Sequence, residues 1–378
     1  MGKEAETLYN EHFEEMSGAN NLDEYSEADV DRVLNRLLKC LPNDGKFYKY
    51  RKGEGQDFDY AYDTLEKGYI WLAQATTLND EVDTTINFDP EKDIEDVKRY
   101  FLAHPIEVFI WVFRKIQETG DLLFGWDQLQ TELFRMVIAC YNLETGELNR
   151  EEAKKVFLSF GCTEQECDST LDKIDGFVKS YLMENEDILK NICDNYLTIN
   201  RKFREMSYVF CVSECYDLDT MWAYYTNNKG FCIEYDFKNV LNLPIEKRRL
   251  FMNFCKVIYS DTKERFSFVP DIQYFLGGYK DKALLAESNR TKIAQLLTKQ
   301  EKWKDEKEWR LFLCNTENKL YADLVSAIYI ENSMLDTDNG KKLLDLAKER
   351  NWRVYTRKLN YIGTKHIYEC IDDKTEDR

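Results

Sequence analysis

The stretch 208–236, YVFCVSECYDLDTMWAYYTNNKGFCIEYD, predicts a strand, a short helix and a second strand joined by short connections. Its first six residues are mostly aromatic, β-branched or cysteine, which is typical of a buried strand. Asp217 and Asp219 offer N-cap oxygens to the helix, and the NNKG run tolerates the positive φ at which helices often end. The last six residues alternate between two faces. We expect this unit to bring Ser213, the rings of the helix and the carboxylates of the second strand together.

Further strands are expected on both sides of a long helical block. They lie at 46–51, 69–72, 255–259, 309–313, 325–330, 352–358 and 365–370. After the first of them we expect a polar, glycine-containing loop at 52–57 and a helix at 60–67. Between residues 90 and 205 the apolar side chains instead repeat every 3.6 positions, which predicts helices such as 150–160.

These elements predict an α+β protein in which a mixed or antiparallel sheet carries a large all-helical insertion. The expected domains are an acidic helical segment at 1–45, an α+β core at 46–90 and 207–378, and the helical insertion at 91–206. In the first segment Ser26 is placed to cap the second helix.

The composition excludes several classes of function. Seventy acidic residues against 52 basic ones give a net charge of −18, which disfavours broad nucleic-acid binding. The 11 cysteines include no CxxC pair and the three histidines are far apart, so we expect reduced thiols and no metal site. No run is long and apolar enough to span a membrane, and the first residues have no apolar signal region. We therefore expect a cytoplasmic protein that does not bind membranes.

The segment 302–313 holds the clearest candidate site. On a strand, Trp309 and its apolar neighbours would face one way, and Glu306, Glu308 and Arg310 the other. This polar face is either a solvated sheet edge or a site facing a cleft. In a cleft the two carboxylates would repel each other and one pKa would rise. Such an arrangement suits the stabilisation of positive charge.

Arg51 ends the strand 46–51, next to Tyr48 and Tyr50. Two interpretations stay open for this cation. Its stem can lie along apolar surface with the guanidinium in water, or it can bind an anion between stacking rings.

Several stretches resemble a prokaryotic family called domain of unknown function 2971. They are FYKYR (47–51), YDTLEKGYIWLAQATTLND (62–80), CVSE (211–214), MWAYYTNNKGFCIEYD (221–236), KWKDEKEWRLF (302–312) and, more weakly, SAIYIENS (326–333). The chain departs from the family at Glu81, where a proline is usual after Asn-Asp, and at Val212, where Phe is more common. The resemblance implies a shared core domain and does not imply an activity.

The order of an Arg strand, a strand carrying a Ser, and a Glu-x-Glu strand is also similar to mono-ADP-ribosyltransferases of the Arg–Ser–Glu type. That resemblance implies an ADP-ribosyltransferase-like sheet and NAD as the substrate. The catalytic residues that it implies are Glu308, Glu306 and Ser213. The cofactor-binding residues that we expect are Arg51, Tyr50, Tyr224, Tyr225, Trp222, Arg310 and Asn79. Glu308 would stabilise the oxocarbenium ion formed as nicotinamide leaves.

Two functions of different classes therefore stay open. One is an NAD-consuming ADP-ribosyltransferase or glycohydrolase, as in a defence or toxin-type effector. The other is a non-catalytic ligand-binding or sensor module of a prokaryotic defence or stress system. A third hypothesis is a different hydrolase. In either main case we expect a nucleotide ligand, no metal, and a protein acceptor or regulator that contacts the helical insertion.

Overall fold

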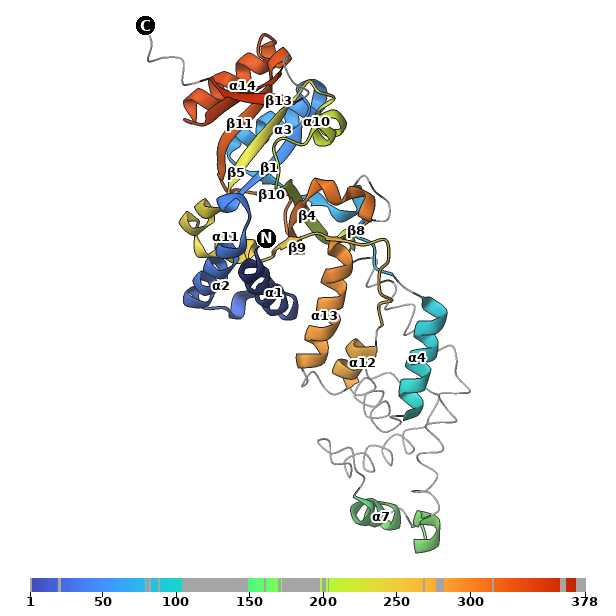
Figure 1. Cartoon of the computed structure of the whole chain (residues 1–378). Coiled ribbons are helices and arrows are strands. Elements are labelled where there is room, and N and C mark those ends of the chain that lie inside the picture. Colours follow the sequence, from blue (N-terminus) through green and yellow to red (C-terminus); the bar gives the residue numbers. More distant parts are fainter. Residues whose placement is uncertain are drawn as a thin grey trace. The chain divides into compact units, whose positions relative to one another are not determined.

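The computed structural model describes residues 2–19, 22–78, 80, 83–87, 89–103, 149–159, 161–168, 171, 198, 202, 204–267, 269–276, 282–314, 316–360 and 365–371. The chain forms two compact units (Figure 1). Unit 1 comprises Met1–Ile86, Arg201–Glu264 and Lys292–Arg378, and unit 2 comprises Asn87–Asn200 and Arg265–Thr291. The second unit thus includes 265–291, a segment that the sequence analysis assigned to the α+β core.

Unit 1 mixes helices and strands. Its helices are α1 (Lys3–Gly18), α2 (Glu27–Cys40), α3 (Gly55–Lys67), α10 (Asp219–Thr226), α11 (Ile245–Phe251) and α14 (Asp338–Glu349). Its strands are β1 (Lys46–Arg51), β2 (Ile70–Trp71), β3 (Ala73–Gln74), β4 (Ser207–Ser213), β5 (Phe231–Asp236), β6 (Phe254–Lys256), β7 (Ile258–Tyr259), β8 (Thr298–Lys299), β9 (Glu308–Cys314), β10 (Lys319–Leu320), β11 (Val325–Glu331), β12 (Arg353–Leu359) and β13 (His366–Cys370). Short 3₁₀ turns are η1 (Leu22–Glu24), η2 (Asn43–Gly45), η3 (Ala75–Thr77), η4 (Phe237–Asn242), η5 (Glu301–Glu306) and η6 (Asn332–Met334).

In unit 2 the described helices are α4 (Pro90–Ala103), α7 (Arg150–Ser159) and α12 (Val269–Leu276), and α13 (Lys282–Leu297) begins in unit 2 and ends in unit 1. The helix predicted at 150–160 is confirmed as α7. Arg265 bridges Asp93 and Asp96 of α4 within this unit. Most of the other predicted insertion helices lie outside the described residues.

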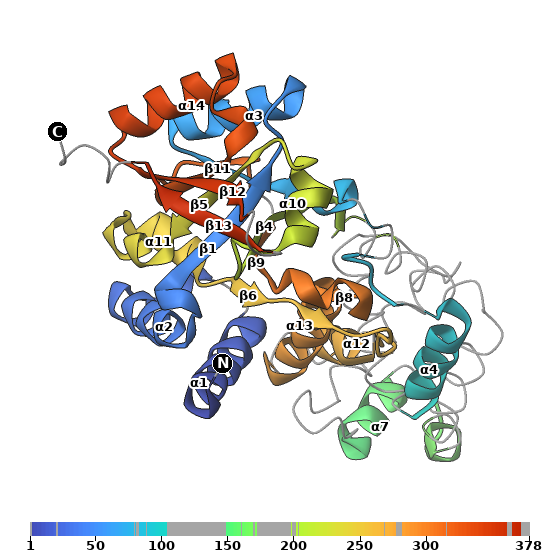
Figure 2. The same cartoon turned by 45° about the horizontal axis from the view of Figure 1, so that its top comes forward.

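The main sheet confirms the α+β class. Its order is β13-β12-β11-β5-β1-β4-β9-β6, with β3 also paired to β4. β11 and β12 are parallel and the other pairs are antiparallel, so the sheet is mixed. Figures 1 and 2 show α3 and α14 together on one side of it, where α14 packs on β11 and β12.

The stretch 208–236 forms the predicted strand, helix and strand as β4, α10 and β5. The helix ends at Asn227 with φ 54°, as its NNKG run predicts. Its N-terminus differs from the expectation, because the N-cap is Leu218 and no side chain caps the helix. Asp219 instead lies in the first turn and pairs with Arg357 at 2.7 Å.

Two other boundaries differ from the sequence prediction. α3 begins at Gly55, inside the stretch predicted as a loop, because Gly55 takes φ +68° and turns the chain directly into the helix. Glu306 lies at the end of a 3₁₀ turn rather than on a strand, because Lys307 takes φ 46° and breaks the alternation before β9.

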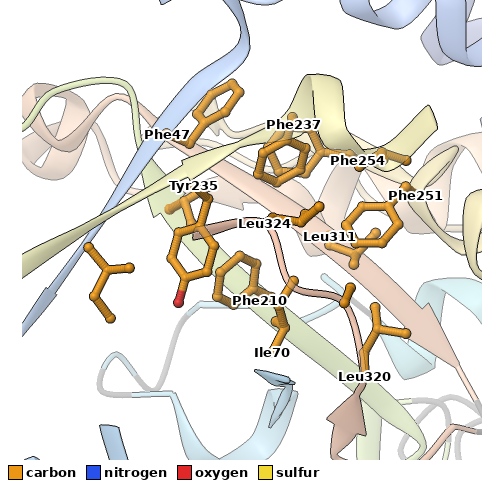
Figure 3. Close-up of a cluster of buried hydrophobic side chains, with 14 of the residues drawn as sticks. Phe47, Ile70, Phe210, Tyr235, Phe237, Phe251, Phe254, Leu311, Leu320 and Leu324 are labelled. Atoms are coloured by element: carbon orange, nitrogen blue, oxygen red, sulfur yellow. The ribbon is translucent and has the colours of Figure 1, made fainter. Parts of the chain in front are cut away.

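One large apolar core holds unit 1 together (Figure 3). Trp309 and Phe231 are both fully buried in it, as the strand alternation predicts. Trp309 stacks on Phe254 with ring centroids 5.3 Å apart, and Phe47 packs edge-on against Phe254 at 5.0 Å. Helices α1 and α2 add side chains to the same core, so residues 1–45 pack as part of unit 1. Ser26 caps α2 in a complete capping box, as predicted.

The sheet consists of two halves that meet at one point. β1 pairs with β5 along its whole length, from Lys46 to Arg51. With β4, in contrast, β1 shares only the pair Tyr48–Ser213. β4 pairs along its length with β9 instead. Beyond that single pair, β1 and β4 diverge, and they leave room for a cavity.

Candidate functional site

The cavity lies inside unit 1 and has a volume of about 1330 Å³. β1 and β4 contribute to its wall from the two halves of the sheet, and α3, α10, η5, β9 and the short strands β2, β3, β8 and β10 add to it. The predicted site residues that line it are Tyr50, Arg51, Tyr224, Tyr225, Glu308 and Arg310. The divergence of β1 and β4 therefore brings together residues that are far apart in the sequence.

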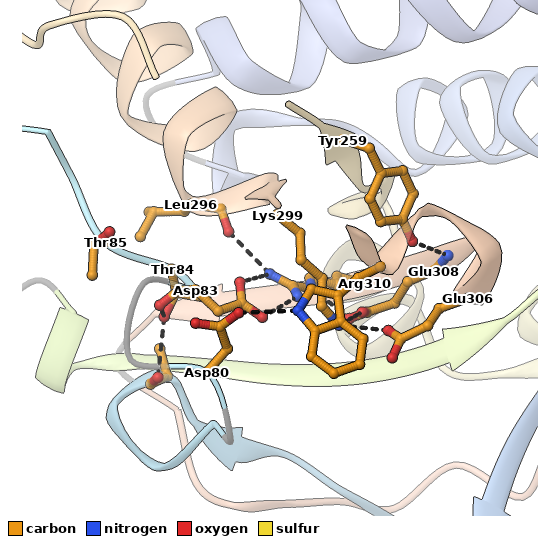
Figure 4. Close-up of polar contacts among 12 residues, drawn as sticks. Asp80, Asp83, Thr84, Thr85, Tyr259, Leu296, Lys299, Glu306, Glu308 and Arg310 are labelled. Carbon is orange, nitrogen blue, oxygen red and sulfur yellow. Dashed lines mark hydrogen bonds and ion pairs between the residues drawn. The ribbon is translucent and has the colours of Figure 1, made fainter. Parts of the chain in front are cut away.

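Arg310 is the centre of a buried ionic network (Figure 4). Its guanidinium donates to both carboxylate oxygens of Asp83, at 2.8 and 2.7 Å, and its Nε donates to Glu308 Oε1 at 2.6 Å. A further bond reaches the carbonyl of Leu296 at 3.2 Å. Because Arg310 is fully buried and Glu308 only 6% exposed, these bonds replace the water that both charges have lost.

Lys299 joins the two glutamates. Its Nζ donates to Glu306 Oε2 at 2.5 Å and to Glu308 Oε2 at 2.8 Å. Tyr225 donates its hydroxyl to the remaining oxygen of Glu306 at 2.9 Å. All four carboxylate oxygens of the pair therefore accept a hydrogen bond, and Glu308 faces the cavity with both of its oxygens occupied.

The carboxylates of Glu306 and Glu308 differ in how readily they ionise. Burial raises the pKa of Glu306 in spite of the opposing charge of Lys299. Burial also disfavours ionised Glu308, but the charges of Arg310 and Lys299 outweigh it and hold the pKa of Glu308 below its ordinary value. One pKa of the pair rises, as the sequence predicts, and it belongs to Glu306.

Two other basic side chains in the cavity, Lys49 and Arg51, form no ion pair with the described residues, and the carboxylates of Glu308 and Asp57 act on them only at longer range. Lys49 and Arg51 lie two residues apart on β1, so they share a face of the strand. Lys49 donates to the carbonyl of Cys211 at 2.6 Å and lies 4.7 Å from the ring centroid of Phe210. The Nε of Arg51 is buried without a hydrogen-bond partner. In the described part of the chain, neither cation pairs with a carboxylate.

The electrostatics of these two cations follow from that environment. Burial, together with the nearby charge of Arg51, lowers the pKa of Lys49 to about 7. Burial likewise lowers the pKa of Arg51. Lys49 is therefore close to losing its proton near neutral pH unless an anion binds beside it.

Aromatic rings line other parts of the cavity. Tyr224 on α10 is 56% exposed, and its ring lies 5.7 Å from that of Trp303 in η5. Trp71 on β2 and Tyr60 on α3 are 42% and 63% exposed. Large exposed rings in a concave site offer stacking surfaces to a planar ligand.

Ser213 and Trp222 are predicted site residues whose polar groups bond to the backbone instead of lining the cavity. The hydroxyl of Ser213 donates to the carbonyl of Glu306 at 2.7 Å and accepts from the amide of Cys215, so it stabilises a turn. Trp222 is fully buried and donates to the carbonyl of Tyr216. Asn79 lies outside the described residues.

Tyr50 contributes both to the cavity wall and to a neighbouring apolar cluster. It lines the cavity, yet its ring packs edge-on against Trp222 on the opposite face of β1 from Arg51. Its hydroxyl donates to the carbonyl of Cys215 at 2.8 Å. The side chain is therefore part of the second, smaller apolar cluster.

Sequence reasoning missed Lys49, Lys299 and Asp83. Lys49 carries a usable signal, because period-two alternation on 46–51 places it on the face of Arg51. Lys299 and Asp83 carry none, since neither position has a motif or a periodicity and each meets Glu308 or Arg310 only in the folded chain.

The fold and the site define an α+β protein with a charged, ring-lined cavity. Residues 221–311, which include Tyr224, Tyr225, Glu306, Glu308 and Arg310, match the family model described as protein of unknown function (DUF2971). The predicted resemblance to that family is therefore confirmed over this part of the chain. No curated protein and no solved structure gives a significant match.

In the described residues, no helix is both long and apolar enough to cross a membrane. Nor do these residues hold a group of three or more His, Cys, Asp or Glu side chains placed to bind a metal ion.

Proposed function

We propose that unit 1 is a ligand-binding or sensor module whose cavity receives an anionic, ring-bearing ligand of the nucleotide class. The observation that carries the proposal is the Lys49–Arg51 pair, two partly buried cations side by side that form no ion pair with any described carboxylate. Keeping such charges out of water is unfavourable unless something compensates them. Phosphate oxygens are the natural partners of a guanidinium and an ammonium group.

Two further features support this ligand class. The protein carries a net charge of −18, so the positive charge of the Lys49–Arg51 pair is locally opposite to the overall charge. The exposed rings of Tyr224, Trp71 and Tyr60 provide stacking surfaces for a base in the same cavity. NAD combines both chemical groups and is the ligand that we propose to test first.

A second candidate is NAD-consuming ADP-ribosyl transfer. The observation in its favour is Glu308, which lies on the cavity wall and is kept ionised by Arg310 and Lys299. An ionised carboxylate can stabilise an oxocarbenium ion at the nicotinamide ribose. Binding alone is favoured over catalysis, because both oxygens of Glu308 already accept hydrogen bonds from cations.

In its biological setting, we propose a cytoplasmic prokaryotic protein of a defence or stress system. Unit 2 would then contact the protein regulator or acceptor, while the cavity of unit 1 binds the nucleotide. This division follows the helical character of the insertion, which is separate from the site chemistry.

Calorimetric titration of the full chain with NAD, ATP and inorganic pyrophosphate tests the binding proposal. We expect Arg51→Gln to lower the affinity for each of these anions at least about tenfold, since a hydrogen bond to a charged group contributes about 1.5–3 kcal/mol. Lys341→Gln, at an exposed position of α14 outside the cavity, is the matched control. Absence of binding by all three anions contradicts the proposal.

Nicotinamide release from NAD separates the two candidates. The binding module predicts no release by the wild-type protein above that of a Glu308→Gln variant. Release that depends on Glu308, measured with both proteins folded at the assay temperature, would establish the catalytic candidate instead.

A further inference from the structure

Two separate groups of rings line the cavity of unit 1. The first consists of Tyr224 on α10 and Trp303 in η5, whose ring centroids are 5.7 Å apart. Two further exposed rings on the wall, Tyr60 on α3 and Trp71 on β2, come from other elements and are here called the second group. In the described residues no ring contact links one group to the other. The cavity thus offers two stacking surfaces, each carried by different elements.

Each group has cations beside it. The ammonium groups of Lys302 and Lys299 lie 5.3 and 5.5 Å from the ring centroid of Trp303. Lys319, which pairs with Trp71 across β10 and β2, lies 4.9 Å from the ring centroid of Tyr69. Each group therefore combines an aromatic surface with nearby positive charge.

The two groups approach β1 from opposite faces. α3 packs on the face that carries Arg51, where its Phe58 lies 6.0 Å from Phe231, the register partner of Arg51. α10 packs on the other face, where Trp222 lies 5.5 Å from Tyr50. Lys49 and Arg51 lie on the α3 face of β1 and line the same cavity as both sets of rings.

We infer that the cavity binds an extended dinucleotide, with one ring system on each aromatic group and the linking pyrophosphate at Lys49 and Arg51. This inference rests on the proposed function and adds the shape of the ligand to it. A mononucleotide would occupy one ring group and leave the other empty. The volume of about 1330 Å³ also agrees with a ligand larger than a mononucleotide, because pockets for drug-sized ligands measure about 300–1,000 Å³.

The test compares three probes, namely NAD, ADP and inorganic pyrophosphate, on three variants of the full chain. Tyr224→Ala and Trp71→Ala each remove one stacking surface. Tyr321→Ala removes a ring that is 52% exposed but does not line the cavity, and it is the matched control. Because all three rings are at least 42% exposed, we expect the variants to fold, and a melting curve for each checks this.

We expect Tyr224→Ala and Trp71→Ala each to weaken NAD binding about tenfold, which is within the range measured for loss of one base–aromatic stack. For ADP only one of the two substitutions should matter, and pyrophosphate affinity should respond to neither. Tyr321→Ala should change nothing.

Two results overturn the inference, and they can be told apart. If NAD and ADP bind equally tightly and only one ring substitution weakens NAD binding, the extended dinucleotide is wrong and the proposed anion site stands. If none of the three probes binds the wild-type protein, both the inference and the proposed function are wrong.

Discussion

Two groups of charges line the same cavity and differ in how they are compensated. Around Arg310 every charge has an opposite partner, from Asp83 through Glu308 and Lys299 to Glu306. On β1, Lys49 and Arg51 lie together, and no carboxylate of the described residues is bonded to them. A closed ionic network needs nothing from outside the protein, whereas an open cationic pair is completed by an anion. The comparison therefore assigns the first group to stability and the second to ligand binding.

The largest effect is expected on the unfolding free energy, from a substitution that breaks the ionic network around Arg310. Arg310→Met should destabilise the protein by about 3–5 kcal/mol, because removing one partner of a buried ion pair leaves the other charge uncompensated. Here Asp83 and Glu308 would both lose their guanidinium partner. Chemical denaturation followed by circular dichroism measures the change, with Lys341→Gln as the control. An unfolding free energy equal to that of the wild type would show that this network does not stabilise unit 1.

The buried, neutral side chain of His12 should make the stability of the protein depend on pH. His12 on α1 is fully buried, and neither ring nitrogen has a hydrogen-bond partner of ordinary geometry among the described residues. Burial, together with the charge of Arg36, lowers its pKa to about 4. The unfolded chain, with a histidine pKa of about 6.5, then binds more protons between these values.

The stability contributed by neutral His12 should therefore be present above pH 6.5 and be lost as the pH falls towards 4. The loss should reach about 3 kcal/mol, from 1.36 kcal/mol for each pKa unit. Unfolding free energies of wild type and His12→Leu across this range measure it, since subtracting the two curves removes the other titrating groups. Parallel curves would rule out His12 as the cause.

A smaller effect is expected on the pH dependence of anion binding at the Lys49–Arg51 pair. Because the pKa of Lys49 is about 7, this side chain carries full charge below that pH and loses it above. Pyrophosphate affinity should be highest at pH 6 and fall several-fold by pH 8.5. Lys49→Arg, which stays protonated throughout, should reduce that decline. An unchanged profile in this variant would place the titrating group elsewhere.

The sequence predicted the parts of this site that depend on a local repeat. Alternation along 309–313 placed Trp309 in the core and Glu308 with Arg310 on the other face, as the structure has them. The same rule failed at Glu306, because the positive φ of Lys307 interrupts the strand. Because side chains alternate along β1, Tyr50 and Arg51 lie on opposite faces of the strand, although both were expected to bind the same ligand.

Residues that meet through tertiary folding could not be predicted from one sequence. Asp83 reaches Arg310 from a polar loop, and Lys299 reaches Glu308 from the short strand β8. Neither position has a motif or a periodicity that distinguishes it from a surface charge. The divergence of β1 and β4, which creates the cavity, is likewise visible only in their register.

Measuring both the unfolding free energy and the NAD affinity of Arg51→Gln decides whether the Lys49–Arg51 pair serves ligand binding. We predict unfolding free energy equal to or above that of the wild type, because the substitution removes a buried charge that lacks a partner. We predict at the same time a loss of NAD affinity of at least about tenfold. A variant that loses stability and keeps its NAD affinity would contradict the assignment of the Lys49–Arg51 pair to ligand binding.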